Sequence, residues 1–158
     1  MPNKPNIRKI GIVDVEFGEH VTVVEPANLY GCRIGNHSFV GPFVEIQKNS
    51  HIGSHTRIQS HSFICELASI GNHCFIGHGV MFINDTFSSG RPSYDQPEAW
   101  VETKIGDHVT VGSNATILPV SICENVVIGA GAVVTSDITI PGFYAGAPAR
   151  LVRPIPKP

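Results

Sequence analysis

The sequence predicts an all-β fold in which six-residue repeats wind into a parallel β-helix, and three observations support this prediction. Every sixth residue from Ile34 to Phe82 is bulky and apolar, the residue after it is often glycine, and a small or β-branched residue stands four positions after it. A six-residue period fits neither the 3.6-residue turn of an α-helix nor the alternation of a hairpin. It indicates a short strand followed by a tight corner.

The repeat covers most of the 158 residues. It contracts to five residues from Leu29 to Ile34 and from Ile117 to Ile122, and it can be read backwards through Val23 to Phe17. Three sides make a triangular coil of about 18 residues, and coils stack about 4.8 Å apart as parallel strands. The repeated apolar residues are predicted to form the core: Ile34, Val40, Ile46, Ile52, Ile58, Ile64, Ile70, Ile76, Phe82, Ile105, Val111, Ile117, Ile122, Ile128 and Val134.

Composition and charge narrow the classes of function. With 42% hydrophobic residues the chain can bury a core, and we expect a single domain over residues 1–158. The net charge of −2 argues against nucleic acid or a membrane surface as partner. No apolar run approaches the roughly 18 residues of a membrane span, and Met1 to Lys9 lead into no signal-peptide run. Four cysteines without a Cys-x-x-Cys pair predict reduced thiols in a cytoplasmic protein.

Most of the histidines fall at a corner of the predicted coil, three residues after an apolar repeat position. Residues that tolerate a left-handed backbone collect at such corners, and histidine, asparagine and aspartate are enriched among them. We therefore interpret this set as turn residues, with only His51 and His78 outside it. The set comprises His20, His37, His55, His61, His73 and His108 together with Asn49, Asn114, Asn125, Gly131 and Asp137.

The repeat is interrupted between Phe82 and Ile105, which predicts an extruded loop over residues 83–104. Such an excursion in a regular coil is usually functional, although a tolerated surface insertion is the alternative. The loop holds the only tryptophan, Trp100, together with Phe87 and Tyr94. These aromatic side chains are expected to cover a ligand or a neighbouring subunit.

The 18-residue coil predicts two rows of polar residues beside this loop. Lys48, Glu66 and Asn84 share one corner, one coil apart, while His61 and His78 lie on adjacent coils at another corner. Two corners of one coil are too far apart for direct hydrogen bonds, so a site using both rows would form between subunits. The flat sides of a β-helix favour side-by-side packing, and closed symmetry then favours a homotrimer.

The repeat resembles that of the hexapeptide-repeat acyltransferases, whose coils are left-handed. Parallel crossovers are almost always right-handed, so the left-handed prediction rests on this resemblance alone. Residues 141–153, in a short C-terminal tail over 141–158, also resemble the P-x-x-x-x-G-x-P-A-[KR] ending of that family. The resemblance implies acetyl-CoA as co-substrate. The residues expected to bind coenzyme A are Lys104, Gly112, Ala130, Ala147, Arg150 and Arg153.

Residues 44–49, 61–66 and 75–85 are similar to segments of bacterial nucleotide-sugar N-acetyltransferases. These enzymes acetylate the 3-amino group of UDP- or dTDP-linked amino sugars for surface polysaccharides. Their asparagine at the point where the loop leaves the coil corresponds to Asn84. The resemblance implies the same acceptor class here, with further contacts expected from Lys48, His61, Glu66, Arg91 and Tyr94.

The chemistry of the acceptor favours an amine. Hydroxyl acceptors need an adjacent base, usually a loop histidine, and residues 83–104 contain none. We expect Asn84 to orient the amine with support from Asp85, and backbone N–H groups to stabilise the oxyanion. His78, with His61, is the candidate proton acceptor; alternatively the departing thiolate takes the proton.

Three alternatives remain open at this stage. An O-acetyltransferase would act on a sugar or another small hydroxyl acceptor. A γ-type carbonic anhydrase, a zinc enzyme of the same fold, could use His73 and His78, but zinc needs three ligands and His73 belongs to the turn residues, so no metal site is expected. A non-catalytic scaffold trimer would show no affinity for coenzyme A.

Overall fold

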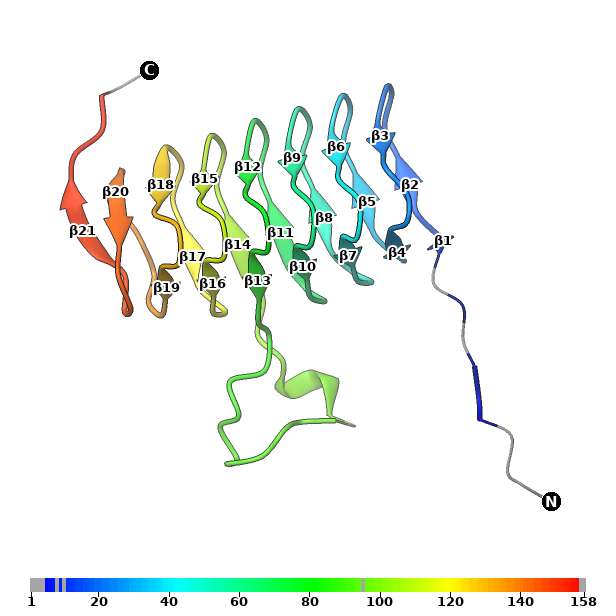
Figure 1. The fold of residues 1–158 in the computed structure, drawn as a ribbon. Coiled ribbons are helices and arrows are strands. Elements are labelled where there is room, and N and C mark those ends of the chain that lie inside the picture. Colours follow the sequence, from blue (N-terminus) through cyan, green and yellow to red (C-terminus); the bar gives the residue numbers. More distant parts are fainter. Residues whose placement is uncertain (1–4, 8, 10, 95, 157–158) are drawn as a thin grey trace.

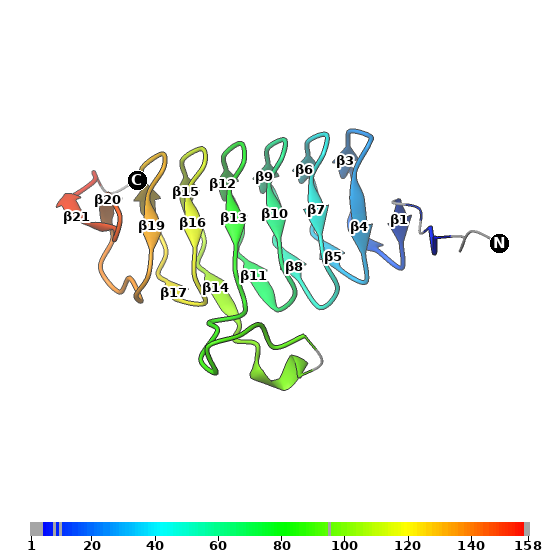
Figure 2. The same ribbon diagram turned by 60° about the horizontal axis from the view of Figure 1, so that its bottom comes forward.

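The computed structural model describes residues 5–7, 9, 11–94 and 96–156, so both ends of the predicted domain, residues 1–4 and 157–158, lie outside it. Three parallel sheets wind around one core, as Figures 1 and 2 show. The predicted left-handed parallel β-helix is confirmed. The chain passes repeatedly from sheet A to sheet B to sheet C, and we name the corners between them AB, BC and CA.

Each sheet collects one short strand per coil, listed here in spatial order. Sheet A contains β1 (Ile12–Val13), β4 (Asn28–Tyr30), β7 (Glu45–Ile46), β10 (Phe63–Ile64), β13 (Met81–Phe82), β16 (Thr116–Ile117) and β19 (Val133–Val134). Sheet B contains β17 (Ser121–Ile122), β14 (Thr103–Ile105), β11 (Ala68–Ile70), β8 (His51–Ile52), β5 (Arg33–Ile34) and β2 (Glu16–Phe17). Sheet C contains β21 (Arg150–Arg153), β20 (Gly142–Ala145), β18 (Val126–Ile128), β15 (Thr110–Val111), β12 (Phe75–Ile76), β9 (Arg57–Ile58), β6 (Phe39–Val40) and β3 (Thr22–Val23).

The predicted core is confirmed along the whole regular part of the helix. All the apolar repeat positions from Ile34 to Val134 are buried. The small column is buried as well, and its hydroxyl groups link successive coils: Ser38 Oγ donates to Gly53 O and Ser62 Oγ to Gly77 O, each at 2.8 Å. The repeat also extends backwards as the sequence indicates, because Leu29, Val23 and Phe17 lie in β4, β3 and β2, but burial does not reach its first position. Phe17 is 43% exposed, because the first coils have a neighbour on one side only.

The corner residues adopt the left-handed backbone that the sequence predicts, with φ between 55° and 67° for every predicted member except one. The exception is Asp137, which does not adopt a positive φ. Its carboxylate accepts a hydrogen bond from Ser121 N at 2.8 Å, at the point where the regular coil ends. The prediction for Asp137 is therefore wrong, because no further coil follows to impose the corner geometry.

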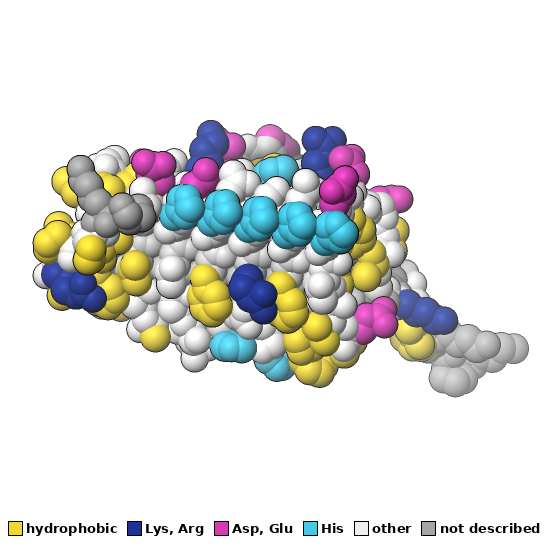
Figure 3. Space-filling view, turned by 90° about the horizontal axis from the view of Figure 1, so that it is seen from above, with side chains coloured by type: hydrophobic (Ala, Val, Ile, Leu, Met, Phe, Trp, Pro, Cys, Tyr) yellow, Lys and Arg dark blue, Asp and Glu magenta, His cyan; other side chains and the backbone are white. Residues whose placement is uncertain are grey.

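Five of the corner histidines form a continuous stack along the BC corner. The rings of His20, His37, His55, His73 and His108 follow one another with centroids 4.8–5.0 Å apart. Figure 3 shows this row running along the molecule. His61 belongs to the CA corner instead, where its ring stacks on Phe43 at 4.9 Å.

The loop and the tail differ slightly from their predicted bounds. The loop starts after β13, contains the short 3-10 helix η1 (Pro97–Ala99) and ends at Glu102, because Thr103 and Lys104 already pair with β11 in β14. The C-terminal segment is no loose tail. Its strand β20 continues sheet C parallel to β18, and β21 adds an antiparallel strand beside it.

The four cysteines are free thiols, as predicted. Burial raises the pKa of Cys32 to about 11 and that of Cys65 to about 12. Thiols with such pKa values are protonated and unreactive near neutral pH. In the part of the chain that the structure describes, no helix has the length and apolar character needed to span a membrane.

The left-handed corner makes a testable prediction at His55, which has a φ of 57°. Asparagine occupies equivalent corners at Asn49 and Asn114 and tolerates this backbone, so His55→Asn should change the free energy of unfolding by less than about 1 kcal/mol. His55→Val places a β-branched side chain there and should cost about 1–2 kcal/mol. Denaturant unfolding measures both; equal stability of the two variants would contradict the prediction.

Candidate active site

The predicted row at the AB corner is confirmed and lies at the neck of the extruded loop. Asn84 is the second residue of the loop, and its Nδ2 donates to Glu66 O on the preceding coil at 3.2 Å. Glu66 Oε1 in turn lies 3.7 Å from Lys48 Nζ one coil further toward the N-terminus. The Glu66 side chain is only 13% exposed, whereas that of Lys48 is 56% exposed. The Asn84 amide thus contacts the backbone of Glu66, and the Glu66 carboxylate pairs with the partly exposed ammonium group of Lys48.

Three residues that the sequence reasoning missed adjoin this row, two on the coil of Lys48 and one on the coil before it. Gln47 Oε1 accepts from Glu66 N at 3.3 Å, and Gln47 Nε2 donates to Glu45 Oε1 at 2.9 Å. Burial raises the pKa of Tyr30, and the nearby carboxylates of Glu45 and Glu66 raise it further, so its hydroxyl stays protonated as a donor. The same 18-residue register that identified Lys48 would have placed these side chains.

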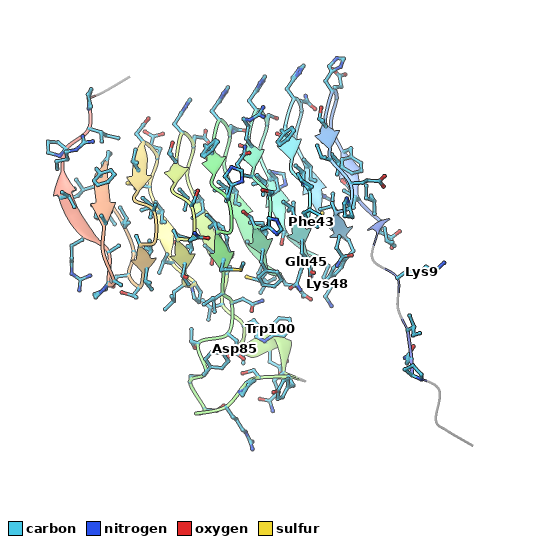
Figure 4. The ribbon with its side chains drawn as sticks, viewed as in Figure 1. Lys9, Phe43, Glu45, Lys48, Asp85 and Trp100 are labelled. Carbon is cyan, nitrogen blue, oxygen red and sulfur yellow. The ribbon has the colours of Figure 1, made fainter. Side chains whose placement is uncertain are left out.

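The loop is held in shape by Asp85 and by a backbone contact at its neck. Val101 N donates to Asn84 O at 2.9 Å, which closes the base of the loop. The Asp85 carboxylate accepts from Ser93 N at 2.7 Å and from Phe87 N at 2.8 Å, and these hydrogen bonds lower its pKa. Figure 4 shows Asp85 and Trp100 in the loop and Glu45 and Lys48 on the neighbouring coils. Asp85 therefore ties together the loop backbone directly after Asn84.

Arg91 and Tyr94 lie together within the loop. They line a hollow of about 370 Å³ with Ser89, Pro92, Ser93 and Gln96. Tyr94 is 80% exposed, so its ring is available to a ligand or to another subunit. The two residues thus belong to the loop, whereas Lys48 and Glu66 belong to the coil.

The two histidines of the second row lie at the CA corner, on the other side of sheet A from Asn84. His61 lies between β9 and β10, and His78 lies between β12 and β13 on the next coil. His78 Nδ1 is 2.8 Å from Ser60 Oγ, and the residue is exposed at the surface. A single chain therefore does not bring His78 to Asn84.

Part of the predicted coenzyme A set forms a row that continues from His78 toward the C-terminus. Gly112 and Ala130 occupy the CA corner on successive coils, packed so closely that a Cβ on Gly112 would lie 2.4 Å from Ala130 N. Ala147 and Arg150 follow at the C-terminal end, where Arg150 Nη1 donates to Ala149 O. The result is a corner lined by small residues.

Two members of the predicted set have other contacts. The guanidinium of Arg153 lies 5.0 Å from the centroid of the Phe143 ring on sheet C. Lys104 lies on sheet B and forms an ion pair with Glu102, so a single chain does not place it in the CA row.

The His73–His78 pair does not form a zinc site. His73 belongs to the stack at the BC corner and His78 to the CA corner, so the two rings lie on different edges of the coil. Among the described residues, no three His, Cys, Asp or Glu side chains are grouped to hold a metal ion.

Comparison with known sequences identifies the repeat. Residues 31–66 match the family described as "Bacterial transferase hexapeptide (six repeats)", and residues 102–136 match "Hexapeptide repeat of succinyl-transferase". The chain therefore carries the hexapeptide repeat of bacterial transferases on two separate segments. Both matched segments lie on the regular coils, on either side of the extruded loop.

Curated relatives include the bifunctional protein GlmU of Streptococcus uberis, 29% identical over 150 residues that make up 90% of this chain and 32% of that protein. The galactoside O-acetyltransferase of Escherichia coli is 48% identical over 52 residues, 32% of this chain and 26% of its own length. The chain thus spans about a third of the length of the curated relatives it matches.

Two solved structures share the fold. One is a hexapeptide-repeat acetyltransferase of Vibrio cholerae in complex with acetyl-coenzyme A, with a TM-score of 0.64 and 26% identity over 80% of this chain and 72% of its own. The other is a mutant of the N-acyltransferase AntD of Bacillus cereus in complex with dTDP and coenzyme A, with a TM-score of 0.64 and 21% identity over 88% and 83% of the two chains.

The Asp85 contacts predict how the loop responds to mutation and pH. Asp85→Ala should loosen residues 83–102, seen as faster limited proteolysis in the loop and a red-shifted Trp100 emission, while Glu98→Gln in the same loop should change neither. The pKa of Asp85 in the folded protein lies below its ordinary value of 3.8. The stabilisation that its carboxylate gives to the loop is therefore fully present above pH 3.8 and is lost as the pH falls through the lowered pKa. A loop as protected in Asp85→Ala as in the wild type would refute this role.

Proposed function

We propose that this protein is an acetyl-CoA-dependent N-acetyltransferase that acts on the 3-amino group of a nucleotide-linked amino sugar. The observation that carries the proposal is the Lys48–Glu66–Asn84 row at the neck of the loop. A largely buried carboxylate beside an amide is suited to hold a sugar ammonium group and then the amine. An exposed lysine one coil away is suited to an adjacent phosphate. A cytoplasmic location and a role in surface polysaccharide synthesis belong to the same proposal.

The proposal includes a homotrimer with three sites between subunits. Sheet A presents Phe63, Met81 and Val133 outward, and Phe43 is 57% exposed at its CA edge. Sheet B presents mainly polar or charged side chains outward. We infer that sheet A faces the partner subunits, because apolar surface favours burial in an interface. Packing of this kind brings the AB corner of one subunit to the CA corner of the next.

Transfer then proceeds by attack of the amine on the thioester carbonyl. Asn84 donates to Glu66 O through Nδ2, so its Oδ1 is available to accept from the amine and fix its direction. The C–N bond forms as the C–S bond breaks and coenzyme A departs. The proton lost by the nitrogen passes to Nε2 of His78 of the partner subunit, or directly to the departing thiolate.

Acetyl-CoA is proposed to lie along the CA corner. The small residues Gly112, Ala130 and Ala147 leave room there for an extended chain, and Arg150 at the C-terminal end is suited to a phosphate. The acetyl-CoA complex of the Vibrio cholerae acetyltransferase supports this co-substrate. AntD indicates that the fold can hold coenzyme A and a dTDP group together.

O-acetylation of a sugar is the second candidate, favoured by the 48% identity of a 52-residue stretch to the galactoside O-acetyltransferase of Escherichia coli. The absence of histidine from the loop argues against it, because a hydroxyl needs a base beside it. A thiol-release assay with acetyl-CoA and a panel of UDP- and dTDP-linked 3-amino sugars distinguishes the two. Reaction with the matching hydroxyl sugars and with no amine would overturn the N-acetyltransferase proposal.

Asn84→Ala is expected to lower kcat for the amine by about 100-fold or more, because a misdirected nucleophile loses most of the benefit of positioning. The thiol-release rate measures this effect. The control is Asn72→Ala, which removes an amide at the BC corner and should leave kcat unchanged. An Asn84→Ala enzyme with the wild-type rate would remove Asn84 from the reaction.

His78→Ala is expected to lower kcat by about 100-fold if its imidazole takes the proton, with His73→Asn at the BC corner as control. Mixed assemblies of Asn84→Ala and His78→Ala chains should regain part of the activity, because one kind of interface joins an intact Asn84 to an intact His78. An unchanged rate in His78→Ala would assign the proton to the thiolate. Mixed assemblies as inactive as their parents would contradict a site shared between subunits.

A further inference from the structure

A second cavity lies beside the same corner and is not used by the proposed reaction. It has a volume of about 460 Å³ and lies where the first three coils turn from sheet A into sheet B. Its walls contain acidic and basic side chains and several groups that can donate or accept hydrogen bonds. The lining residues are Asp14, Glu16, Gly31, Cys32, Arg33, Asn49, Ser50 and His51.

This cavity is continuous with the row at the loop neck. Gly31 packs directly on Lys48, since a Cβ on Gly31 would lie 2.8 Å from Lys48 Cβ. Asn84, Glu66, Lys48, Gly31 and Asp14 therefore follow one another along the AB corner, one per coil. Four steps between stacked strands cover roughly 19 Å. This span suits an extended nucleoside diphosphate sugar, in which the sugar, two phosphates and the nucleoside follow in line.

The charges along this span change in the order that such a ligand requires. Lys48 comes first after the sugar position, and Arg33 follows one coil further toward the N-terminus on sheet B. The Arg33 guanidinium is held by Glu16, with Nε 2.9 Å from Oε2 and Nη2 3.2 Å from Oε1, and its side chain remains 66% exposed. An oriented guanidinium with free N–H groups is suited to phosphate oxygens.

Beyond Arg33, the far wall consists of acceptors. The Asp14 carboxylate, which as an ion only accepts hydrogen bonds, lies on the first coil, next to Glu16, whose two carboxylate oxygens are held by Arg33. Asp14 would repel a phosphate but suits the hydroxyl groups of a pentose and the N–H of a base. Cationic groups toward the sugar and acceptors at the far end thus match a nucleoside diphosphate in one direction only.

We propose that this cavity binds the nucleoside diphosphate part of the acceptor, with the phosphates over Lys48 and Arg33 and the nucleoside against Asp14. The direction of the ligand rests on the proposed function, because it starts from an amine held at Asn84. The acceptor then occupies the N-terminal coils and acetyl-CoA the C-terminal coils, and the two meet at the loop neck. Arg33 and Asp14 act in binding and orientation and do not touch the reacting atoms.

Calorimetric titration of the full chain with UDP and with dTDP tests the proposal without any turnover. Arg33→Gln should raise the Kd of the nucleotide that the wild type binds by about tenfold or more, and Asp14→Asn should raise it less. The matched control is Arg57→Gln, which removes the same charge from sheet C, where Arg57 lies over the Phe39 ring. Thermal melting checks that each variant is folded. No binding of either nucleotide by the wild type, or unchanged affinity in both cavity variants, would overturn the proposal.

Steady-state kinetics separate this proposal from the N-acetyltransferase assignment. Arg33→Gln should raise KM for the nucleotide-linked acceptor about tenfold while kcat and KM for acetyl-CoA stay near wild type. If the enzyme acetylates amines and the KM for the acceptor is the same in the wild type and in both cavity variants, nucleotide binding in this cavity is refuted while the N-acetyltransferase proposal stands. If Arg33→Gln binds UDP or dTDP more weakly than the wild type but no amine is acetylated, nucleotide binding in the cavity is supported and the N-acetyltransferase proposal is refuted.

Discussion

The stacking of one aliphatic side chain per strand inside a dry, triangular core is the interaction on which the rest of this structure depends. In sheet C, for example, Val40, Ile58, Ile76 and Val111 lie directly above one another in adjacent parallel strands. All four are fully buried. Because each side chain contacts those of the coils above and below, a shift of one residue would turn a whole strand inside out. The core therefore holds every coil in a single register.

This register creates the functional rows. Residues one coil apart are forced to the same corner about 4.8 Å from each other, so Lys48, Glu66 and Asn84 meet although they are far apart in sequence. The same rule produces the histidine stack at the BC corner. The loop does not disturb it, because β14 resumes pairing with β11 after the excursion. The regular coil thus carries one irregular segment, the extruded loop, at the point where the polar row ends.

The sequence pattern predicted the strands, the core and most corners because each depends on local periodicity alone. It failed where neighbours are missing: Phe17 is exposed on a terminal coil, and Asp137 lies where the regular coil ends. It also missed Gln47 and Glu45, which carry no special motif and matter only through their hydrogen bonds to Glu66 and to each other. The hydrogen-bond partners of Asp85 were likewise not predictable, since Ser93 lies eight residues away in an aperiodic segment.

By itself, the sequence determined the six-residue period, the buried column, the left-handed corners and the place where the chain leaves the coil. These follow from side-chain size and backbone freedom, which repeat regularly and need no partner. Only the tertiary structure decided which polar side chains touch and that a charged cavity continues from Lys48. Those features depend on side chains from separate coils meeting in space, and a linear pattern does not contain the distances between them.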